Sequence, residues 1–276
     1  MLGLGSSLIS SGAVSEPPRV LIASYDFNND SLNGPSATFP SGLGRPSTGA
    51  VTIFGSTTST NQRWFTDDVT TASGGTGPSG GHVGGPDTLD TVITDGTWDS
   101  SSAHRYVQFE ATTNGTGHAT SFHTRQVINI STVSSPFLNL TTAEMTFWFN
   151  VFGSDFGDDV GLGIAVTNSA TDASSAAELG TGLGFTSDTA GGASINYTAL
   201  DGSSVSTNRL GHAGQIQTTG HGAALADNNK WIKATVDLDA ACGEGTVVIH
   251  FCMFTTLGGN AFKQDMCIDS ISIIGQ

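Results

Sequence analysis

Residues 145–152 read MTFWFNVF, and this stretch decides the fold. Apolar residues at every second position share one face of a β-strand, because successive side chains point to opposite sides. Those of this stretch are Met145, Phe147, Phe149 and Val151. Other strand-like runs lie at 20–27, 106–111, 162–166, 232–238, 247–254 and 266–274. Strands at this spacing, with no convincing amphipathic helix between them, predict an all-β chain folded as a two-sheet antiparallel sandwich.

Residues 20–276 are expected to form a single domain. Residues 247–254 are apolar on both faces, as a central strand would be. The last apolar run, 266–274, needs a partner strand, and the first run, 20–27, is the expected one. No stretch reads as a linker between two domains, and 276 residues are enough for one large sandwich with a full core.

Residues 1–19 read as an extended N-terminal arm rather than as core. Pro17 and Pro18 close the arm and favour a stiff, extended connection to the first strand. Such an arm can add to the edge of a partner's sheet or lie in a partner's groove, and the alternative is a frayed terminus. The residues expected to contact the partner are the apolar ones among the glycines and serines: Leu2, Leu4, Leu8 and Ile9.

The chain is acidic but sparsely charged. Its formal net charge is −15, although only 12% of its residues are Asp, Glu, Lys or Arg. Such a surface repels phosphate backbones and anionic lipids, so we expect no nucleic-acid partner. No run of 18 apolar residues occurs, so we expect no membrane partner either. The acidity either keeps the protein soluble or supplies carboxylates for Ca²⁺.

The sequence carries no catalytic signature, and we expect no enzyme. A retaining glycosidase needs two carboxylates about 5 Å apart, whereas the five glutamates of the chain stand isolated from one another. Aspartates on neighbouring strands are the alternative source of such a pair. There is no G-x-S-x-G elbow and no phosphate-binding loop ending in Gly-Lys-Ser/Thr. The three cysteines, Cys242, Cys252 and Cys267, have neither zinc spacing nor the even number of a disulfide framework.

Four stretches, in order along the chain, resemble the MAM domain. They are YDF at 25–27, GPDT at 85–88 with RYV at 105–107, SPFLNL at 135–140 followed by MTFWF at 145–149, and KW at 230–231 with IDSI at 268–271. The resemblance implies a jelly-roll sandwich of the concanavalin-like class with a role in adhesion. Unlike extracellular animal MAM domains, which usually pair cysteines, the chain has no cysteine before Cys242.

The same resemblance implies a structural cation. MAM-like sandwiches place it where the first strand, the Gly-Pro loop and the last strand meet. The matching positions are Asp26, Asp87 or Asp90, and Asp269, with Asn28 as a further oxygen donor. Hard oxygen ligands favour Ca²⁺.

A separate argument from the alternation pattern concerns Asp269. This residue shares its parity with Ile271 and Ile273, so its carboxylate is expected to point into the core. A buried carboxylate needs a metal or hydrogen-bond donors. Backbone N–H groups or an arginine are the alternatives to the metal.

The four tryptophans are treated in two pairs. Trp64 and Trp98 lie in the loop-rich residues 28–104 and are candidate stacking surfaces for a glycan. Trp148 and Trp231 have the opposite parity to the apolar sets of their strands, so they are either exposed or face a covering loop. Core is the more usual place for aromatic side chains of this size.

The opening LGLGSSL segment and the richness in Gly, Ser and Thr resemble bacteriophage structural proteins. This resemblance implies a non-enzymatic virion protein, assembled in the host cytoplasm. We expect a fibre-like or adhesin component of the tail or neck, anchored by the arm. Its partners would be other virion proteins, copies of itself and a host-surface glycan. The alternatives are a capsid decoration or cement protein, and a carbohydrate-binding or adhesion module of a bacterial surface protein.

Overall fold

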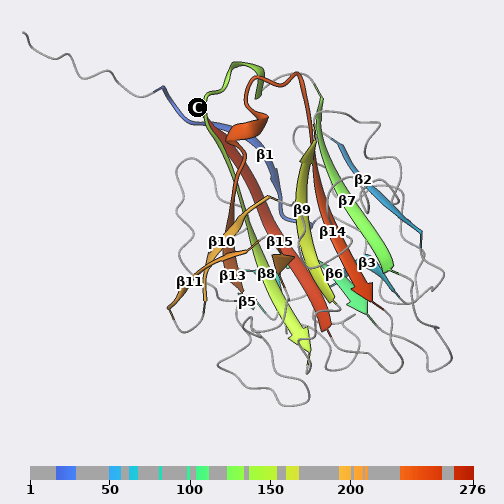
Figure 1. Ribbon diagram of the computed structural model, residues 1–276. Helices are drawn as coiled ribbons and strands as arrows, with labels where there is room; N and C mark the ends of the chain where they lie inside the picture. Colours follow the sequence, from blue (N-terminus) through green and yellow to red (C-terminus); the bar gives the residue numbers. More distant parts are fainter. Residues whose placement is uncertain are drawn as a thin grey trace, which may run out of the picture.

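The computed structural model describes residues 17–28, 50–56, 62–67, 81–82, 98–99, 104–111, 123–133, 137–153, 160–167, 193–199, 202–207, 209–210, 231–256 and 264–276. Within these ranges the chain forms strands and two short 3₁₀ turns, Phe137–Asn139 and Asp239–Ala241. The strands build two facing antiparallel sheets (Figure 1). The expected all-β, two-sheet antiparallel sandwich is therefore confirmed. No helix in the described ranges is long and apolar enough to cross a membrane.

The larger sheet has eight strands. Seven of them follow the order β11-β10-β13-β8-β15-β6-β3, and β1 pairs with β15 off this path. Their bounds are β1 Val20–Tyr25, β3 Gln62–Asp67, β6 Tyr106–Ala111, β8 Ala143–Gly153, β10 Ile195–Thr198, β11 Ser204–Thr207, β13 Ile232–Asp237 and β15 Gln264–Gly275. The strands expected from the sequence at 106–111 and 145–152 lie here within a few residues of their expected ends.

The smaller sheet has five strands in the order β12-β9-β14-β7-β2. Their bounds are β2 Ala50–Ser56, β7 His123–Val133, β9 Val160–Thr167, β12 Arg209–Leu210 and β14 Thr246–Thr256. The run at 247–254 thus forms a central strand, as expected, because β14 pairs with β7 on one side and β9 on the other. A separate two-stranded ribbon joins β4, Gly81–His82, to β5, Trp98–Asp99.

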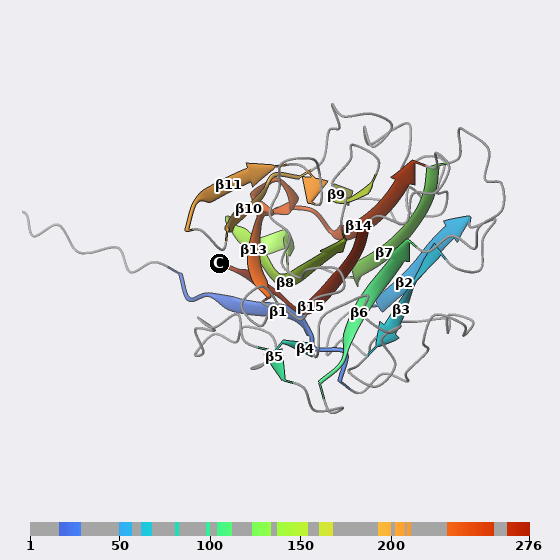
Figure 2. The ribbon, with the colours of Figure 1, turned by 90° about the horizontal axis from the view of Figure 1, so that it is seen from below.

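The last strand of the chain lies at the middle of the larger sheet. β15 pairs with β8 along one edge. Its other edge is shared, because residues 271–275 pair with β1 and residues 266–268 pair with β6. The expected pairing of the first strand with the last is confirmed, and Figure 2 shows β1 and β6 lying along β15. The end of β1 and the start of β6 therefore meet beside residues 269–270.

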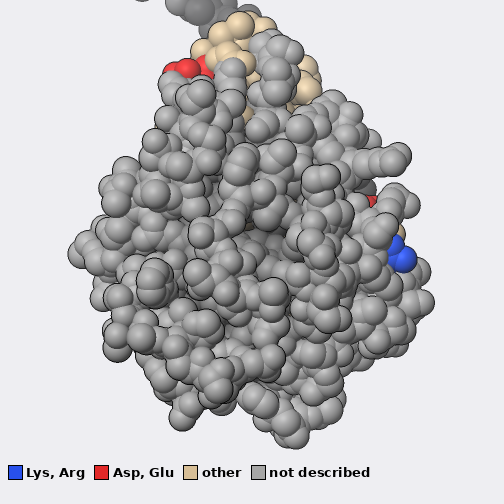
Figure 3. Space-filling view, turned by 90° about the vertical axis from the view of Figure 1, so that its right-hand side faces the viewer, with Lys and Arg blue, Asp and Glu red and all other residues tan. Residues whose placement is uncertain are grey.

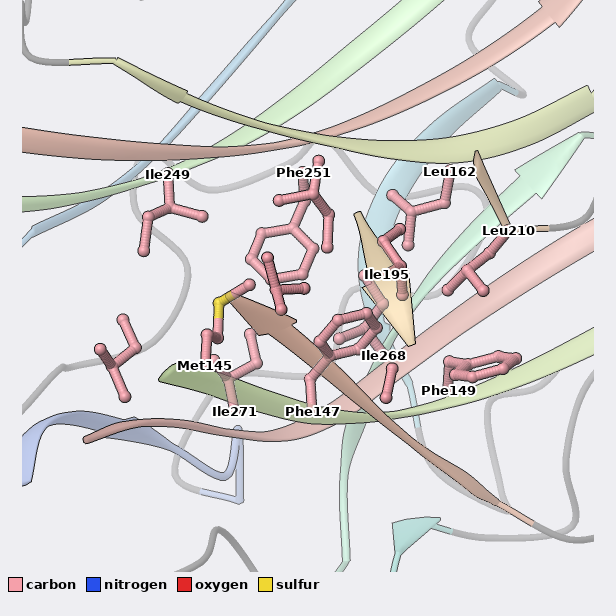
Figure 4. Packing of buried hydrophobic residues seen from close by; sticks show 14 of the residues in the cluster. Met145, Phe147, Phe149, Leu162, Ile195, Leu210, Ile249, Phe251, Ile268 and Ile271 are labelled. Carbon is pink, nitrogen blue, oxygen red and sulfur yellow. The ribbon is translucent and has the colours of Figure 1, made fainter. Parts of the chain in front are cut away.

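The hydrophobic core fills the space between the two sheets (Figure 4). Met145, Phe147 and Phe149 of β8 point into it, as the alternation predicts, and Phe251 of β14 faces them from the smaller sheet. The rings of Phe147 and Phe251 meet edge to face with their centroids 5.4 Å apart. This geometry is favourable for aromatic pairs beyond the area that they bury. Side chains from both sheets thus interdigitate in one continuous core.

A second buried cluster lies on the opposite, outer face of the larger sheet. It consists of Tyr106, Trp148, Trp231 and Cys267. Trp148 and Trp231 are only 4% and 2% exposed, so of the two expectations for these tryptophans the exposed one is wrong. The rings of Tyr106 and Trp231 meet edge to face at 5.6 Å. The ribbon of β4 and β5 lies on this outer side, with β4 against β15 (Figure 2).

A bulge in β15 overturns the expected direction of Asp269. Asp269 pairs with Trp148 and Ser272 pairs with Thr146, so two residues of β15 oppose one residue of β8. Ser270, inside the bulge, has a φ of 52°. The extra residue breaks the alternation, which is the usual effect of a bulge. Asp269 is buried, as expected, but it points to the outer face with Trp148 and not into the core with Ile271 and Ile273.

Gly275 is expected to tolerate no side chain. A Cβ atom there would overlap Cδ1 of Leu140 and lie 3.0 Å from the carbonyl oxygen of Thr142. Because that oxygen belongs to the backbone, relief requires a shift of the sheet. Gly275→Ala should lower the free energy of unfolding by about 1–3 kcal/mol, measured by urea denaturation. Gly245→Ala, where the added Cβ meets nothing within 4 Å, is the control. Equal stability of the two variants would contradict the close packing at Gly275.

Candidate functional site

A hollow of about 540 Å³ opens on the outer face of the larger sheet. Its residues come from the residue before β1, from the start of β8, from β10 and β13, from the 3₁₀ turn after β13, and from the end of β15. They are Arg19, Thr142, Ala143, Glu144, Asn196, Thr235, Asp237, Asp239, Ile274, Gly275 and Gln276. We call this hollow the outer groove. The top of the molecule in Figure 3 is the end that holds the C-terminus in Figure 1. The described surface there includes acidic atoms.

Strand register places the polar side chains of the outer groove side by side. Asn196 of β10 pairs with Thr235 of β13. Asp237 of β13 pairs with Glu144 of β8, which pairs in turn with Ile274 of β15. Directly paired residues of antiparallel strands point to the same face. Four neighbouring strands therefore present side chains to the same hollow, two from β13 and one each from β10, β8 and β15.

Hydrogen bonds donated by backbone N–H groups fix the rim of the outer groove. The N–H group of Ala143 donates to Oδ1 of Asp239 at 2.9 Å, and the N–H group of Asp239 donates to Oδ1 of Asp237 at 2.8 Å. The N–H groups of Thr141 and Thr142 donate to the carbonyl oxygen of Gln276 at 2.7 and 3.1 Å. These bonds join the start of β8 to the end of β15 and to the turn after β13. The rim is therefore tied to the sheet.

Several exposed side chains of the outer groove make no hydrogen bond or ion pair with any other residue in the described ranges, and three of them carry charged or amide groups. They are Arg19, Glu144 and Asn196. Arg19 offers up to five N–H donors, Glu144 offers acceptors, and Asn196 offers both. The outer groove thus presents polar atoms that are available to a ligand.

The thiol of Cys242 lies close to the acidic rim. Burial raises the pKa of Cys242, and the charges of Asp239 and Asp237 raise it further. A thiol whose pKa is raised stays protonated at neutral pH, and the protonated form is a poor nucleophile. Cys242 is therefore expected to react slowly with thiol reagents at neutral pH.

The expected cation site falls where β1, β6 and β15 meet. Oδ1 of Asp26 accepts the N–H of Asn28 at 3.2 Å, and Oδ1 of Asn28 accepts the N–H of Arg105 at 2.8 Å. Oδ1 of Asp269 accepts the N–H of Ser270 at 2.7 Å. Backbone N–H donors, one of the alternatives to a metal, are thus present at Asp269. Phe27, between Asp26 and Asn28, has a φ of 57°, which explains why β1 ends at Tyr25 and not at residue 27.

The remaining expected ligands, Asp87 and Asp90, lie outside the described residues. Within the described ranges, no group of three or more His, Cys, Asp or Glu side chains is placed to hold a metal. The junction therefore places Asp26 and Asn28, which follow β1, near the part of β15 that contains Asp269. The complete ligand set stays a prediction.

The other expected site residues are placed only in part. Leu2, Leu4, Leu8 and Ile9 of the arm lie outside the described residues. Of the arm, residues 17–19 are described and exposed, and Arg19 reaches the outer groove. Trp64 lies on β3 and Trp98 on β5, but their side chains are outside the described part. β3 is at the far end of the larger sheet from β10 and β13, so Trp64 is not part of the outer groove.

The outer groove was not predicted from the sequence. Thr235 and Asp237 alternate with buried Ala234 and Val236, so their direction away from the core could have been read from the pattern. The missing information was the register, because Asn196 and Glu144 are brought beside them only by pairing between strands far apart in sequence.

No family model matches the chain, and no curated protein matches it. Among solved structures, the chain is similar to a cleaved adhesin domain of Lys-gingipain from Porphyromonas gingivalis, at 13% identity and a TM-score of 0.39, covering 92% of this chain and 96% of that one. It is similar to TmCBM61 in complex with β-1,4-galactotriose, at 7% identity and a TM-score of 0.31, covering 82% and 88%. It is also similar to the enzymatically active domain of tailspike protein 4 of bacteriophage CBA120, at 10% identity and a TM-score of 0.29. That match covers 82% of this chain but only 19% of the tailspike chain. At TM-scores this low, the likenesses say nothing further about this chain.

Proposed function

We propose that this chain is a non-enzymatic binding component of a bacteriophage particle, an adhesin-like part of its tail or neck. The observation that carries the binding role is the outer groove, in which Arg19, Glu144 and Asn196 offer polar atoms without partners among the described residues. In ligand-binding clefts, a few placed polar groups fix the orientation of the ligand. The strands that form the hollow also pack the core, so the polar groups sit on a rigid support.

The placement in a phage particle is supported by the sequence. The LGLGSSL start and the abundance of Gly, Ser and Thr resemble virion proteins, and the ordered MAM-like motifs resemble adhesion modules. In this proposal the sandwich is a MAM-like jelly roll, and the N-terminal arm anchors it to a neighbouring virion protein. Copies of the chain repeat by the symmetry of the particle.

Two measurements test the proposed function. Gold-labelled antibodies against the purified protein should mark the tail or neck of phage particles in electron micrographs. Labelling of the capsid shell would support a decoration protein instead, and particles without label would contradict the placement in a virion. The purified protein should also compete with particles for adsorption to host cells. Unchanged adsorption at saturating protein would contradict the adhesin role.

We also propose that Asp26, Asn28 and Asp269 hold a Ca²⁺ ion together with Asp87 or Asp90. The support is the meeting of β1 and β6 beside Asp269, which lets oxygen atoms from distant parts of the chain approach one another. A ligand at a hundred times its dissociation constant stabilises the folded state by about 2.7 kcal/mol. For a chain of this size, that corresponds to a rise in melting temperature of about 5–10 °C.

Calcium should therefore raise the melting temperature of protein first treated with a chelator. In Asp269→Asn most of this rise should disappear, because the variant loses one ligand charge. Asp237→Asn removes an exposed carboxylate of the outer groove and should keep the rise. No effect of Ca²⁺ on the unsubstituted protein would contradict the proposed ion.

A further inference from the structure

We propose that the outer groove binds a neutral oligosaccharide. This inference rests on the proposed function, since it names the ligand class and the residues through which the adhesin would hold its receptor. It also moves the site away from Trp64, one of the candidate stacking residues, because β3 is at the far end of the larger sheet from β10 and β13.

The first support is the kind of polar atoms in the outer groove. A sugar hydroxyl both donates and accepts hydrogen bonds, so its binding site needs acceptors and donors close together. Glu144 and Asp237 supply acceptors, Arg19 supplies donors, and Asn196 and Thr235 supply both. Ile274 also lines the outer groove but is only 7% exposed, so the lining is mainly polar.

The second support is the spacing of these side chains. Asn196 and Thr235 are directly paired, as are Asp237 and Glu144. The side chains of directly paired residues stand about 4.5–5.5 Å apart at their Cβ atoms. The two pairs follow each other along β13. Polar groups therefore line the hollow both along β13 and across the sheet, from β10 on one side to β8 on the other. An extended ligand with hydroxyls along its length can therefore bond to both pairs.

The third support is the charge of the lining. The outer groove contains three carboxylates, Glu144, Asp237 and Asp239, against one guanidinium. This excess of negative charge disfavours sialylated, sulfated and other anionic glycans. One oxygen of Asp237 and one of Asp239 already accept backbone N–H groups, and Arg19 stands at the rim, which reduces the attraction for a cationic peptide. A neutral ligand with many hydroxyls fits this balance best.

The fourth support is size. Small-molecule sites in proteins have volumes of about 300–1,000 Å³, and the outer groove measures about 540 Å³. Its lining spans four neighbouring strands and Arg19, the residue before β1. These dimensions suit a short oligosaccharide rather than a protein surface.

The test uses the full chain on an array of neutral, sialylated and glucosamine-containing oligosaccharides. We expect binding to neutral oligosaccharides. For the tightest neutral binder, titration calorimetry should show affinity weakened about tenfold in Asn196→Ala and again in Glu144→Ala, because each substitution removes hydrogen bonds to the sugar. Asn139→Ala, an exposed asparagine outside the outer groove, is the matched control and should bind as the unsubstituted protein does. Circular dichroism checks that all variants keep the β-sheet spectrum.

The contrary outcomes separate the site from the function. Glycan binding that survives both groove substitutions would overturn the outer groove as the site and leave the adhesin role standing. Binding restricted to sialylated or glucosamine-containing oligosaccharides would overturn the neutral ligand. Absence of all glycan binding, while the protein still competes for adsorption to host cells, would overturn this inference alone. Absence of both would overturn the proposed function as well.

Discussion

Replacing Phe147 with alanine should lower the free energy of unfolding by about 3–5 kcal/mol, the largest loss expected from a single substitution in this chain. Phe147 is fully buried between the sheets. Its ring packs edge to face on Phe251 and lies 6.3 Å from that of Phe149. Truncation leaves a cavity in a close-packed interior, and the surrounding side chains of two hydrogen-bonded sheets can collapse into it only in part.

The measurement for Phe147→Ala is urea denaturation followed by circular dichroism. Leu138→Ala provides the control, because the side chain of Leu138 is 50% exposed and lies in a 3₁₀ turn outside the sheets. Its loss should stay within about 0.5 kcal/mol, as is usual for surface positions. If Phe147→Ala were no less stable than Leu138→Ala, the two sheets could not be packed on each other through β8.

Trp231→Ala should be the second most damaging substitution, with a loss of about 3–5 kcal/mol. This residue does not belong to the core between the sheets. It is buried on the outer face of the larger sheet, against Tyr106 and close to Trp148 and Cys267. A loss of this size at Trp231 would mean that the outer face carries a closed hydrophobic cluster of its own.

The variant Trp231→Phe shows whether the loss in Trp231→Ala comes from the missing aromatic contact or from a general disturbance of the chain before β13. Phenylalanine keeps an aromatic ring next to Tyr106, so this variant should lose less than half as much stability as Trp231→Ala. Iodide quenching of tryptophan fluorescence adds a second measurement, since buried indoles are protected from the quencher. Strong quenching of all four tryptophans in the folded protein would contradict the buried positions of Trp148 and Trp231.

Much of the sandwich could be predicted from the sequence because its core strands repeat with a strict period of two. The core face of β8 follows directly from the alternation in residues 145–151. The pairing of β1 with β15 follows because the apolar run at 266–274 needs a partner strand, and the run at 20–27 can supply it. These features depend on local pattern and on burial, which a single sequence contains. The bounds of β1 were less exact, because the positive φ of Phe27 ends the strand inside an apolar run.

What the sequence could not supply was the relation between strands. The bulge at Ser270 reverses the direction of Asp269, and no residue type at that point signals it, since Ser is not the glycine that a positive φ usually favours. The outer groove depends on the register of β10, β13 and β8. A shift of one residue in any of these pairs would turn the polar side chains toward the other face.

The position of β15 has a consequence for synthesis on the ribosome. Its residues 264–275 separate β8 from β1 and β6, so these earlier strands lack this neighbour until residues 264–275 have been translated. At about 5–20 residues per second, the first strand waits for roughly tens of seconds. Until β15 has been synthesised, nascent chains therefore expose open strand edges, and such edges attract other chains. Premature stop codons before codon 264 should yield insoluble products, and host chaperones that hold nascent chains should increase the yield of folded protein.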